Sequence, residues 1–304
     1  MRIVSLLPSA TEIVYALELE DHLVGVSCDC DFPAEATNKP VVSHSSLVID
    51  DTSTPAGIDE DVRASMSASE PIYRLDRELV RTLQPDLILA QDLCRVCAVP
   101  SGHVTEALST IGCSSEVLSL DPHGLFDVLD DIARVASVTG TDQSGERLVS
   151  SLRARIEAVS AVTTGLDPVA VLALEWADPP FTGGHWIPEM VGLAGGREVL
   201  GVAGGPSRSC TWHEIAAADP EVVVFMPCGF GLDEAVEQAT GLFEVPEFAD
   251  LSAARTGRRI VAVDGSSYFS RPGPRLVDGL EILAWALHPA LFPEPPVGRA
   301  KWIG

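Results

Sequence analysis

The chain has 304 residues, 46% of them hydrophobic, so it can bury a sizeable core and form two domains. Its formal net charge is −24, which disfavours a nucleic-acid-binding surface or one that binds an anionic membrane. No apolar run is long enough to span a bilayer, so we expect no membrane insertion. We also expect a monomer. Seven cysteines, an odd number in a chain too large to need cross-links, argue against a complete disulfide framework.

The N-terminal sequence MRIVSLLPSATE lacks the basic region, the apolar region and the cleavage site of a secretory leader. As written, it predicts a cytoplasmic protein. If an initiator methionine has replaced a leader, an extracytoplasmic location is expected instead. The acidic, lysine-poor composition suits either a high-salt environment, where counterions screen self-repulsion, or an ordinary acidic surface.

The first half of the chain alternates segments typical of strands with segments typical of helices. Strands are expected at 2–6, 23–27, 85–90 and 115–120. Helices are expected at 9–17, 76–83, 101–111 and 123–137, the first opened by a capping box from Ser9 to Glu12. Residues 43–75, rich in Ser, Thr, Asp and Pro, show no regular pattern. Strands separated by helices predict a parallel sheet covered on both faces.

The longest helical pattern covers residues 141–164, where apolar residues form one stripe: Leu148, Leu152, Ile156 and Val159. We expect one long helix here, linking an N-terminal lobe (1–140) to a C-terminal lobe (165–304). In the second lobe, strands are expected at 169–175, 221–226 and 258–264. Helices should begin near His185, at a capping box from Thr211 to Glu214, and at 274. The predicted fold class is α/β: two Rossmann-like lobes with parallel sheets, joined by the long helix, with a ligand cleft between them.

Loops at the carboxyl ends of the strands are where open parallel sheets bind ligands. In this sequence they are expected at 8–9, 28–30 and 92–100 in the first lobe, and at 178–186, 226–230 and 265–274 in the second. The second-lobe loops hold five aromatic residues: Phe181, Trp186, Phe230, Tyr268 and Phe269. Core packing explains any one of them, but their clustering favours a site for a large flat ligand.

Three segments resemble a known family. RIVSLLPSATEIVYALELEDHLVGVS, PPFTGGHWIPEMVGLAGG and SSYFSRPGPRLVDGLEILA are similar to segments of the cobalamin and iron-siderophore substrate-binding proteins of ABC importers. With PDLILA and ADPEVVVF, the resemblance covers nearly the whole chain and is strongest to the cobalamin-binding branch. It implies capture of a corrinoid for ABC import or intracellular handling, with no enzymatic activity and no required cofactor. No GxGxxG, P-loop or GxSxG motif suggests otherwise.

The expected ligand-binding residues lie in strand-end loops: Pro8, Ser9, Phe181, His185, Trp186, Tyr268, Phe269 and Arg271. Among them, the resemblance implies the roles of Pro8, Ser9, Phe181 and Tyr268. His185 could reach the axial position of cobalt or iron, or it could form a hydrogen bond at the start of a helix.

Other residues bear on partners and on alternative ligands. The resemblance implies that Glu78 and Glu214 dock on an ABC permease, with His213 replacing Glu214 if the register shifts by one. The alternative ligand is a ferric siderophore or haem, whose anionic groups could meet basic side chains of the second lobe: Arg208, Arg271 and Arg275.

Two cysteine pairs, Cys28/Cys30 and Cys94/Cys97, are expected at the same edge of the first sheet. Four thiolates could close a zinc site, which would make this a thiol- or metal-dependent protein. The alternatives are buried packing residues, disulfides beside the cleft, direct contact with the ligand's metal, or a redox dithiol. Pro100, just behind the second pair, favours a wall of the cleft over a catalytic dithiol.

Overall fold

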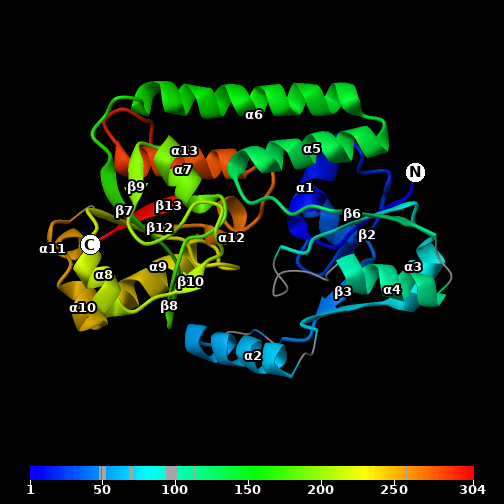
Figure 1. Ribbon diagram of the computed structural model, residues 1–304, viewed down its shortest axis with the longest axis horizontal. Coiled ribbons are helices and arrows are strands. Elements are labelled where there is room, and N and C mark those ends of the chain that lie inside the picture. The colour runs from blue at the N-terminus through cyan, green and yellow to red at the C-terminus, as the bar shows by residue number, and fades with distance from the viewer. Residues whose placement is uncertain (48, 50–52, 69–70, 94–100, 112–113, 258) are drawn as a thin grey trace. The chain divides into compact units, whose positions relative to one another are not determined.

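The computed structural model describes residues 1–47, 49, 53–68, 71–93, 101–111, 114–257 and 259–304. The chain forms two compact units. Unit 1 comprises Met1–Pro122 and Asp130–Val149, and unit 2 comprises His123–Leu129 and Ser150–Gly304. Each unit combines one sheet with helices, which confirms the predicted α/β class (Figure 1).

The sheet of unit 1 has the strand order β4-β3-β2-β1-β5-β6. Its strands are β1 (Ile3–Ser5), β2 (Leu23–Ser27), β3 (Val41–Ser45), β4 (Tyr73–Leu75), β5 (Leu87–Ala90) and β6 (Glu116–Ser119). All neighbours are parallel except β3 and β4. The central strands β1 and β5 are fully buried, as expected for parallel strands with helices on both faces.

The helices of unit 1 correct two expectations. They are α1 (Pro8–Ala16), the 3-10 helix η1 (Ala34–Asn38), α2 (Pro55–Ser67), α3 (Arg77–Leu83) and α4 (Ser101–Ile111). The capping box expected at Ser9 is wrong, because α1 begins at Pro8 and its N-cap, Leu7, has no side-chain cap. Proline suits the first helical position, since its φ is already helical and the N–H it lacks would be unpaired there. Residues 43–75 are also more regular than expected, because β4 and α2 lie within them.

Two helices contribute residues to both units. They are α5 (Leu125–Thr139) and α6 (Asp142–Thr163). The long helix expected at 141–164 is therefore present as α6, with Leu152, Ile156 and Val159 buried as its apolar stripe. None of the described helices is long and apolar enough to cross a membrane.

Unit 2 contains a mixed sheet with the order β10-β8-β7-β11-β12-β13, and β9 also pairs with β7. Its strands are β7 (Val169–Ala177), β8 (Pro180–Thr182), β9 (Gly196–Glu198), β10 (Arg208–Ser209), β11 (Val222–Phe225), β12 (Ile260–Val263) and β13 (Ala300–Ile303). The central strands β7, β11 and β12 are parallel, whereas β8, β10 and β13 are added antiparallel. The expectation of a parallel sheet therefore holds for the centre only.

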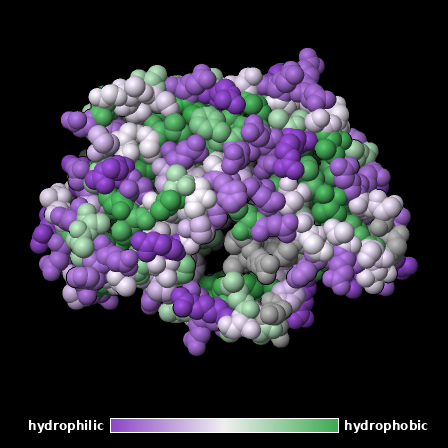
Figure 2. All heavy atoms as spheres, in the orientation of Figure 1, coloured by the Kyte–Doolittle hydropathy of each residue, from purple (hydrophilic) through white to green (hydrophobic). Residues whose placement is uncertain are grey.

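The helices of unit 2 are α7 (Ile187–Leu193), α8 (Trp212–Ala218), α9 (Leu232–Gly241), η2 (Leu242–Glu244), α10 (Pro246–Ala249), α11 (Ser252–Arg255), α12 (Gly265–Tyr268) and α13 (Leu276–Leu287). The capping box expected at Thr211 is confirmed, because the Thr211 hydroxyl accepts from the Glu214 N–H and the Glu214 carboxylate accepts from the Thr211 N–H. Hydrophilic side chains are spread over the whole face shown in Figure 2, in keeping with the net charge of −24.

Candidate functional site

Three aromatic residues gather at the carboxyl ends of the central strands of unit 2. Trp176, near the end of β7, is the cross-strand partner of Phe181 in β8. The centroid of its ring lies 5.6 Å from that of Phe230, which follows β11. All three residues are half-buried, so they form a partly exposed apolar surface, named here the aromatic cluster. Trp176 was missed in the sequence, although as the large aromatic before the expected loop it carried the same signal as Phe181.

Tyr268 lies at the carboxyl end of β12, at the end of the short helix α12. The guanidinium carbon of Arg299 lies 4.9 Å from the centroid of its ring, and that of Arg275 lies 5.7 Å away. Burial raises the pKa of the Tyr268 hydroxyl, and the two arginines only partly oppose this. Tyr268 is therefore a neutral phenol whose ring is in contact with two cations.

Trp186 and Phe269 are more deeply buried than expected for ligand-stacking residues. Trp186 is 6% exposed and Phe269 is 2% exposed. The Trp186 indole N–H donates to the Phe269 carbonyl oxygen at 2.8 Å, which joins the loop before α7 to the end of α12. Both rings therefore pack within unit 2, and their part in ligand binding stays a prediction from the sequence. Arg271 is also engaged locally, because it donates to the Ser266 hydroxyl at 3.2 Å.

His185 lies in the loop between β8 and α7 with a positive φ of 50°. Its N–H donates to the Gly205 carbonyl at 2.6 Å, and its carbonyl accepts from the Gly204 N–H at 2.9 Å. Its ring is half-buried, 6.1 Å from the ring of His123. Burial first, and then His123, lowers the pKa of His185, so the neutral imidazole that can bind a metal is favoured.

In unit 1 the expected ligand residues Pro8 and Ser9 form the first turn of α1. Pro8 is half-buried, whereas Ser9 is only 2% exposed. The structure therefore places the Ser9 side chain in the interior of unit 1 and leaves Pro8 as the accessible member of the pair.

The cysteine pairs are only partly described. Cys30 is buried, and its sulfur lies 3.0 Å from the Thr11 hydroxyl and 3.2 Å from that of Ser27. Burial raises the pKa of the Cys30 thiol. Although Cys28 is exposed as a residue, partial burial of its thiol and the charge of Asp29 raise its pKa to about 11.

Cys94 and Cys97 lie outside the described residues. Within the described ranges, no group of three or more His, Cys, Asp or Glu side chains is arranged to hold a metal ion. The zinc site remains a prediction from the sequence.

The two expected docking acids differ in their surroundings. Glu78 is exposed in the first turn of α3. Glu214 accepts from Thr211 in the capping box and lies 3.4 Å from Arg208, and the Thr211 hydrogen bonds hold the pKa of Glu214 below its ordinary value. His213, its alternative, is exposed on the same helix.

Known proteins similar to this chain agree with this architecture. The vitamin B12-binding protein of Vibrio cholerae is 24% identical over 284 residues, which cover 92% of this chain and 86% of that protein. The periplasmic heme-binding protein RhuT from Roseiflexus sp. RS-1 superposes with a TM-score of 0.71 and 26% identity, covering 95% of this chain and 98% of that one. The periplasmic vitamin B12-binding protein BtuF of Vibrio cholerae superposes with a TM-score of 0.68 and 22% identity, covering 95% and 97%.

These similarities confirm the expected resemblance to binding proteins of the cobalamin and siderophore type. They give no support to the expected cytoplasmic location, since both solved structures are described as periplasmic. The family described as "Periplasmic binding protein" matches residues 3–264, which is well over half of the chain. The chain therefore belongs to the periplasmic binding protein family.

Proposed function

We propose that this protein captures a corrinoid outside the cytoplasm and delivers it to an ABC importer, without chemistry of its own. The observation that carries the proposal is the aromatic cluster of Trp176, Phe181 and Phe230, at the strand ends where α/β sheets bind ligands. Similarity to a vitamin B12-binding protein over 92% of the chain supports the choice of a corrinoid.

A corrinoid is large and flat and has apolar faces, so its affinity would come mainly from burial against aromatic rings. The rings of the aromatic cluster are half-buried, so a bound ligand would cover the part of their surface that is still exposed to solvent. Tyr268 would add a further aromatic contact, made by a ring that Arg275 and Arg299 polarise. In this proposal Trp186 and Phe269 support the site without contacting the ligand. Their hydrogen bond fixes the loops that carry His185 and Tyr268.

The test is calorimetric titration of the purified protein with cyanocobalamin and with cobinamide. We expect one site with a sub-micromolar Kd, equivalent to a binding free energy of about −8 kcal/mol or stronger. Phe181→Ala and Trp176→Ala should each weaken binding by about 2 kcal/mol, the loss typical of a central aromatic contact. Val297→Ala, at a fully exposed apolar residue, is the control and should bind as the wild type does. The absence of heat and of any spectral change with either ligand would refute the corrinoid assignment.

Haem is the second candidate, and a specific observation favours it. The imidazoles of His123 and His185 are 6.1 Å apart, and the lowered pKa of His185 keeps it available as an iron ligand. Titration with hemin distinguishes the two ligands. A shift of the haem absorption band that is lost in His185→Asn, together with no response to cyanocobalamin, would select haem.

Docking on a permease would use Glu78, the exposed acid of α3. Glu214 is less suited to this role because its carboxylate caps α8. Glu78→Gln should leave ligand affinity unchanged and reduce ligand uptake by cells that carry the cognate permease. Unchanged uptake would remove Glu78 from the docking surface.

A further inference from the structure

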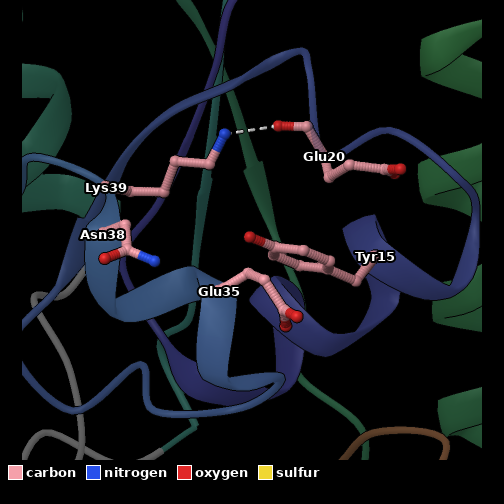
Figure 3. Close-up of a pocket in the computed structure, with 5 residues that line it drawn as sticks. All are labelled: Tyr15, Glu20, Glu35, Asn38 and Lys39. Carbon is pink, nitrogen blue, oxygen red and sulfur yellow. Dashed lines mark hydrogen bonds between the residues drawn. The ribbon is translucent and has the colours of Figure 1, made fainter.

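A pocket lies in unit 1, away from the strand-end loops of that unit. Its volume is about 530 Å³, and it is lined by Tyr15, Glu20, Glu35, Asn38 and Lys39 (Figure 3). These residues come from the end of α1, the turn before β2, the 3-10 helix η1 and the residue just after it.

The connections of the chain place this pocket at the amino ends of the strands. Glu20 precedes β2, which begins at Leu23, and Lys39 precedes β3, which begins at Val41. The expected ligand loop 28–30 follows β2 at its carboxyl end, so it lies at the opposite end of that strand. The pocket shares no residue with the site proposed above, and the inference does not rest on that proposal.

The pocket contains an unsatisfied hydrogen-bonding group. The hydroxyl oxygen of Tyr15 is buried and has no hydrogen-bond partner within the described part of the chain. Native proteins rarely leave such a group unpaired, so the Tyr15 hydroxyl keeps an unused capacity to donate a hydrogen bond. Burial, Glu35 and Glu20 all raise the pKa of Tyr15, so its hydroxyl stays protonated and able to donate.

Lys39 is held in place by the backbone rather than by a carboxylate. Its ammonium donates to the main-chain carbonyl of Glu20 at 2.6 Å, while the Glu20 carboxylate points away (Figure 3). An ammonium has three N–H donors, so this bond leaves it able to bind another acceptor. Asn38 turns its side-chain amide toward the same space as the Tyr15 hydroxyl, as Figure 3 shows. Three side chains with donor groups, Lys39, Tyr15 and Asn38, thus line the pocket.

The charges of the pocket restrict the class of ligand. Glu20 and Glu35 oppose a simple anion, and Lys39 opposes a simple cation. A molecule with both charges satisfies both sets of groups. We propose that this pocket binds a small zwitterion of the amino acid or dipeptide class, with its carboxylate on Lys39, Tyr15 and Asn38 and its ammonium facing Glu35.

The test uses three small probes with the full chain. Diglycine carries both charges, N-acetylglycine has no ammonium, and glycinamide has no carboxylate. The chain has three tyrosines, so selective ¹³C labelling of tyrosine rings allows the Tyr15 signal to be assigned with Tyr15→Phe. We expect diglycine to shift the Tyr15 signal saturably, with N-acetylglycine and glycinamide at least about tenfold weaker, the equivalent of 1.4 kcal/mol.

Two variants keep the proposal falsifiable. Lys39→Gln should weaken diglycine binding at least about tenfold, whereas Lys301→Gln, at the only other lysine, should not. Tyr15→Phe should weaken binding without lowering the unfolding temperature, because it removes an unpaired hydroxyl. The proposal fails if diglycine gives no saturable shift, if N-acetylglycine binds equally well, or if Lys39→Gln binds like the wild type.

Discussion

At the scale of single residues, His185 combines a left-handed backbone conformation with a lowered side-chain pKa. Its φ of 50° lies in the left-handed region, which Asn tolerates better than most residues. Its half-buried ring faces His123, and the pKa of His185 is lower than its ordinary value of 6.5. The folded protein therefore resists protonation of His185 more than the unfolded chain does.

We predict a pH-dependent stability that originates at His185. As pH falls below about 6.5, the unfolded chain takes up the proton first, so the stability present above that pH is lost progressively toward the lowered pKa. Urea unfolding from about pH 8 to about pH 5 should show a smaller loss for His185→Asn than for the wild type. His123→Asn should fall between them, since His123 is the second cause of the shift. Identical losses in all three proteins would contradict this.

Cys28 and Cys30 should be unreactive at neutral pH for two different reasons. Cys30 is inaccessible and hydrogen-bonded to Thr11, whereas Cys28 is exposed but has a pKa of about 11. Only the thiolate reacts, so iodoacetamide at about pH 7 should label Cys28 slowly and Cys30 not at all in the folded state. Mass spectrometry of the digested protein should show Cys28 labelling rise steeply toward about pH 10, with Cys30 labelled only after unfolding. Rapid labelling of Cys28 at neutral pH would show that its thiolate is stabilised, as a metal site would require.

At the scale of elements, the two expected capping boxes show what a local pattern can decide. The box at Thr211 formed because its two hydrogen bonds connect residues within one turn. The box at Ser9 failed because Pro8, one residue earlier, already serves as the first helical residue. A capping-box pattern thus predicts the first residue of a helix only where no neighbouring residue suits that position better.

The backbone of α13 lies very close to the backbone of Tyr268 at Gly279. A Cβ on Gly279 of α13 would clash with the Tyr268 carbonyl oxygen, whereas a Cβ on Gly192 of α7 would meet nothing within 4 Å. We predict that Gly279→Ala destabilises the protein by about 1–3 kcal/mol and displaces Tyr268, because the backbone must move. Gly192→Ala is the matched control and should be neutral or stabilising by up to about 1 kcal/mol, since alanine favours helix. Urea unfolding measures both, and equal effects would show that Tyr268 is not held by this contact.

At the scale of the whole molecule, the fold was more predictable than the candidate site. The periodicity of hydrophobic residues predicted the α/β class. The rule that α/β sheets bind ligands at the carboxyl ends of their strands predicted which loops to consider. Exposure of the aromatic rings was not predictable, because it depends on packing between distant segments. Trp186 and Phe269 are buried by a contact between residues 83 positions apart. Trp176 became part of the cluster through Phe230, 54 residues later.

Charge acts on the molecule in two opposite ways. The net charge of −24 is a repulsion distributed over the whole chain, and salt screens it. Arg155 of α6 makes a local attraction in unit 2, with two hydrogen bonds to Glu281 at 2.7 and 2.8 Å and one to Asp278 at 3.1 Å. Salt should weaken this attraction, though less than a fully exposed pair, because Arg155 is 34% exposed and Asp278 22%.

We therefore predict two responses to sodium chloride between about 0.1 M and 1 M, where the screening length falls from about 10 Å to about 3 Å. The unfolding temperature of the wild type should rise, since the distributed repulsion outweighs single ion pairs. Arg155→Met should destabilise the protein by about 1 kcal/mol at low salt and by less at high salt, as partly exposed ion pairs do. Arg147→Met, at an exposed position on the same helix, is the control and should stay within about 0.5 kcal/mol of the wild type at both. A wild-type unfolding temperature that falls with salt would mean that local attractions, not the net charge, dominate the electrostatic energy of this fold.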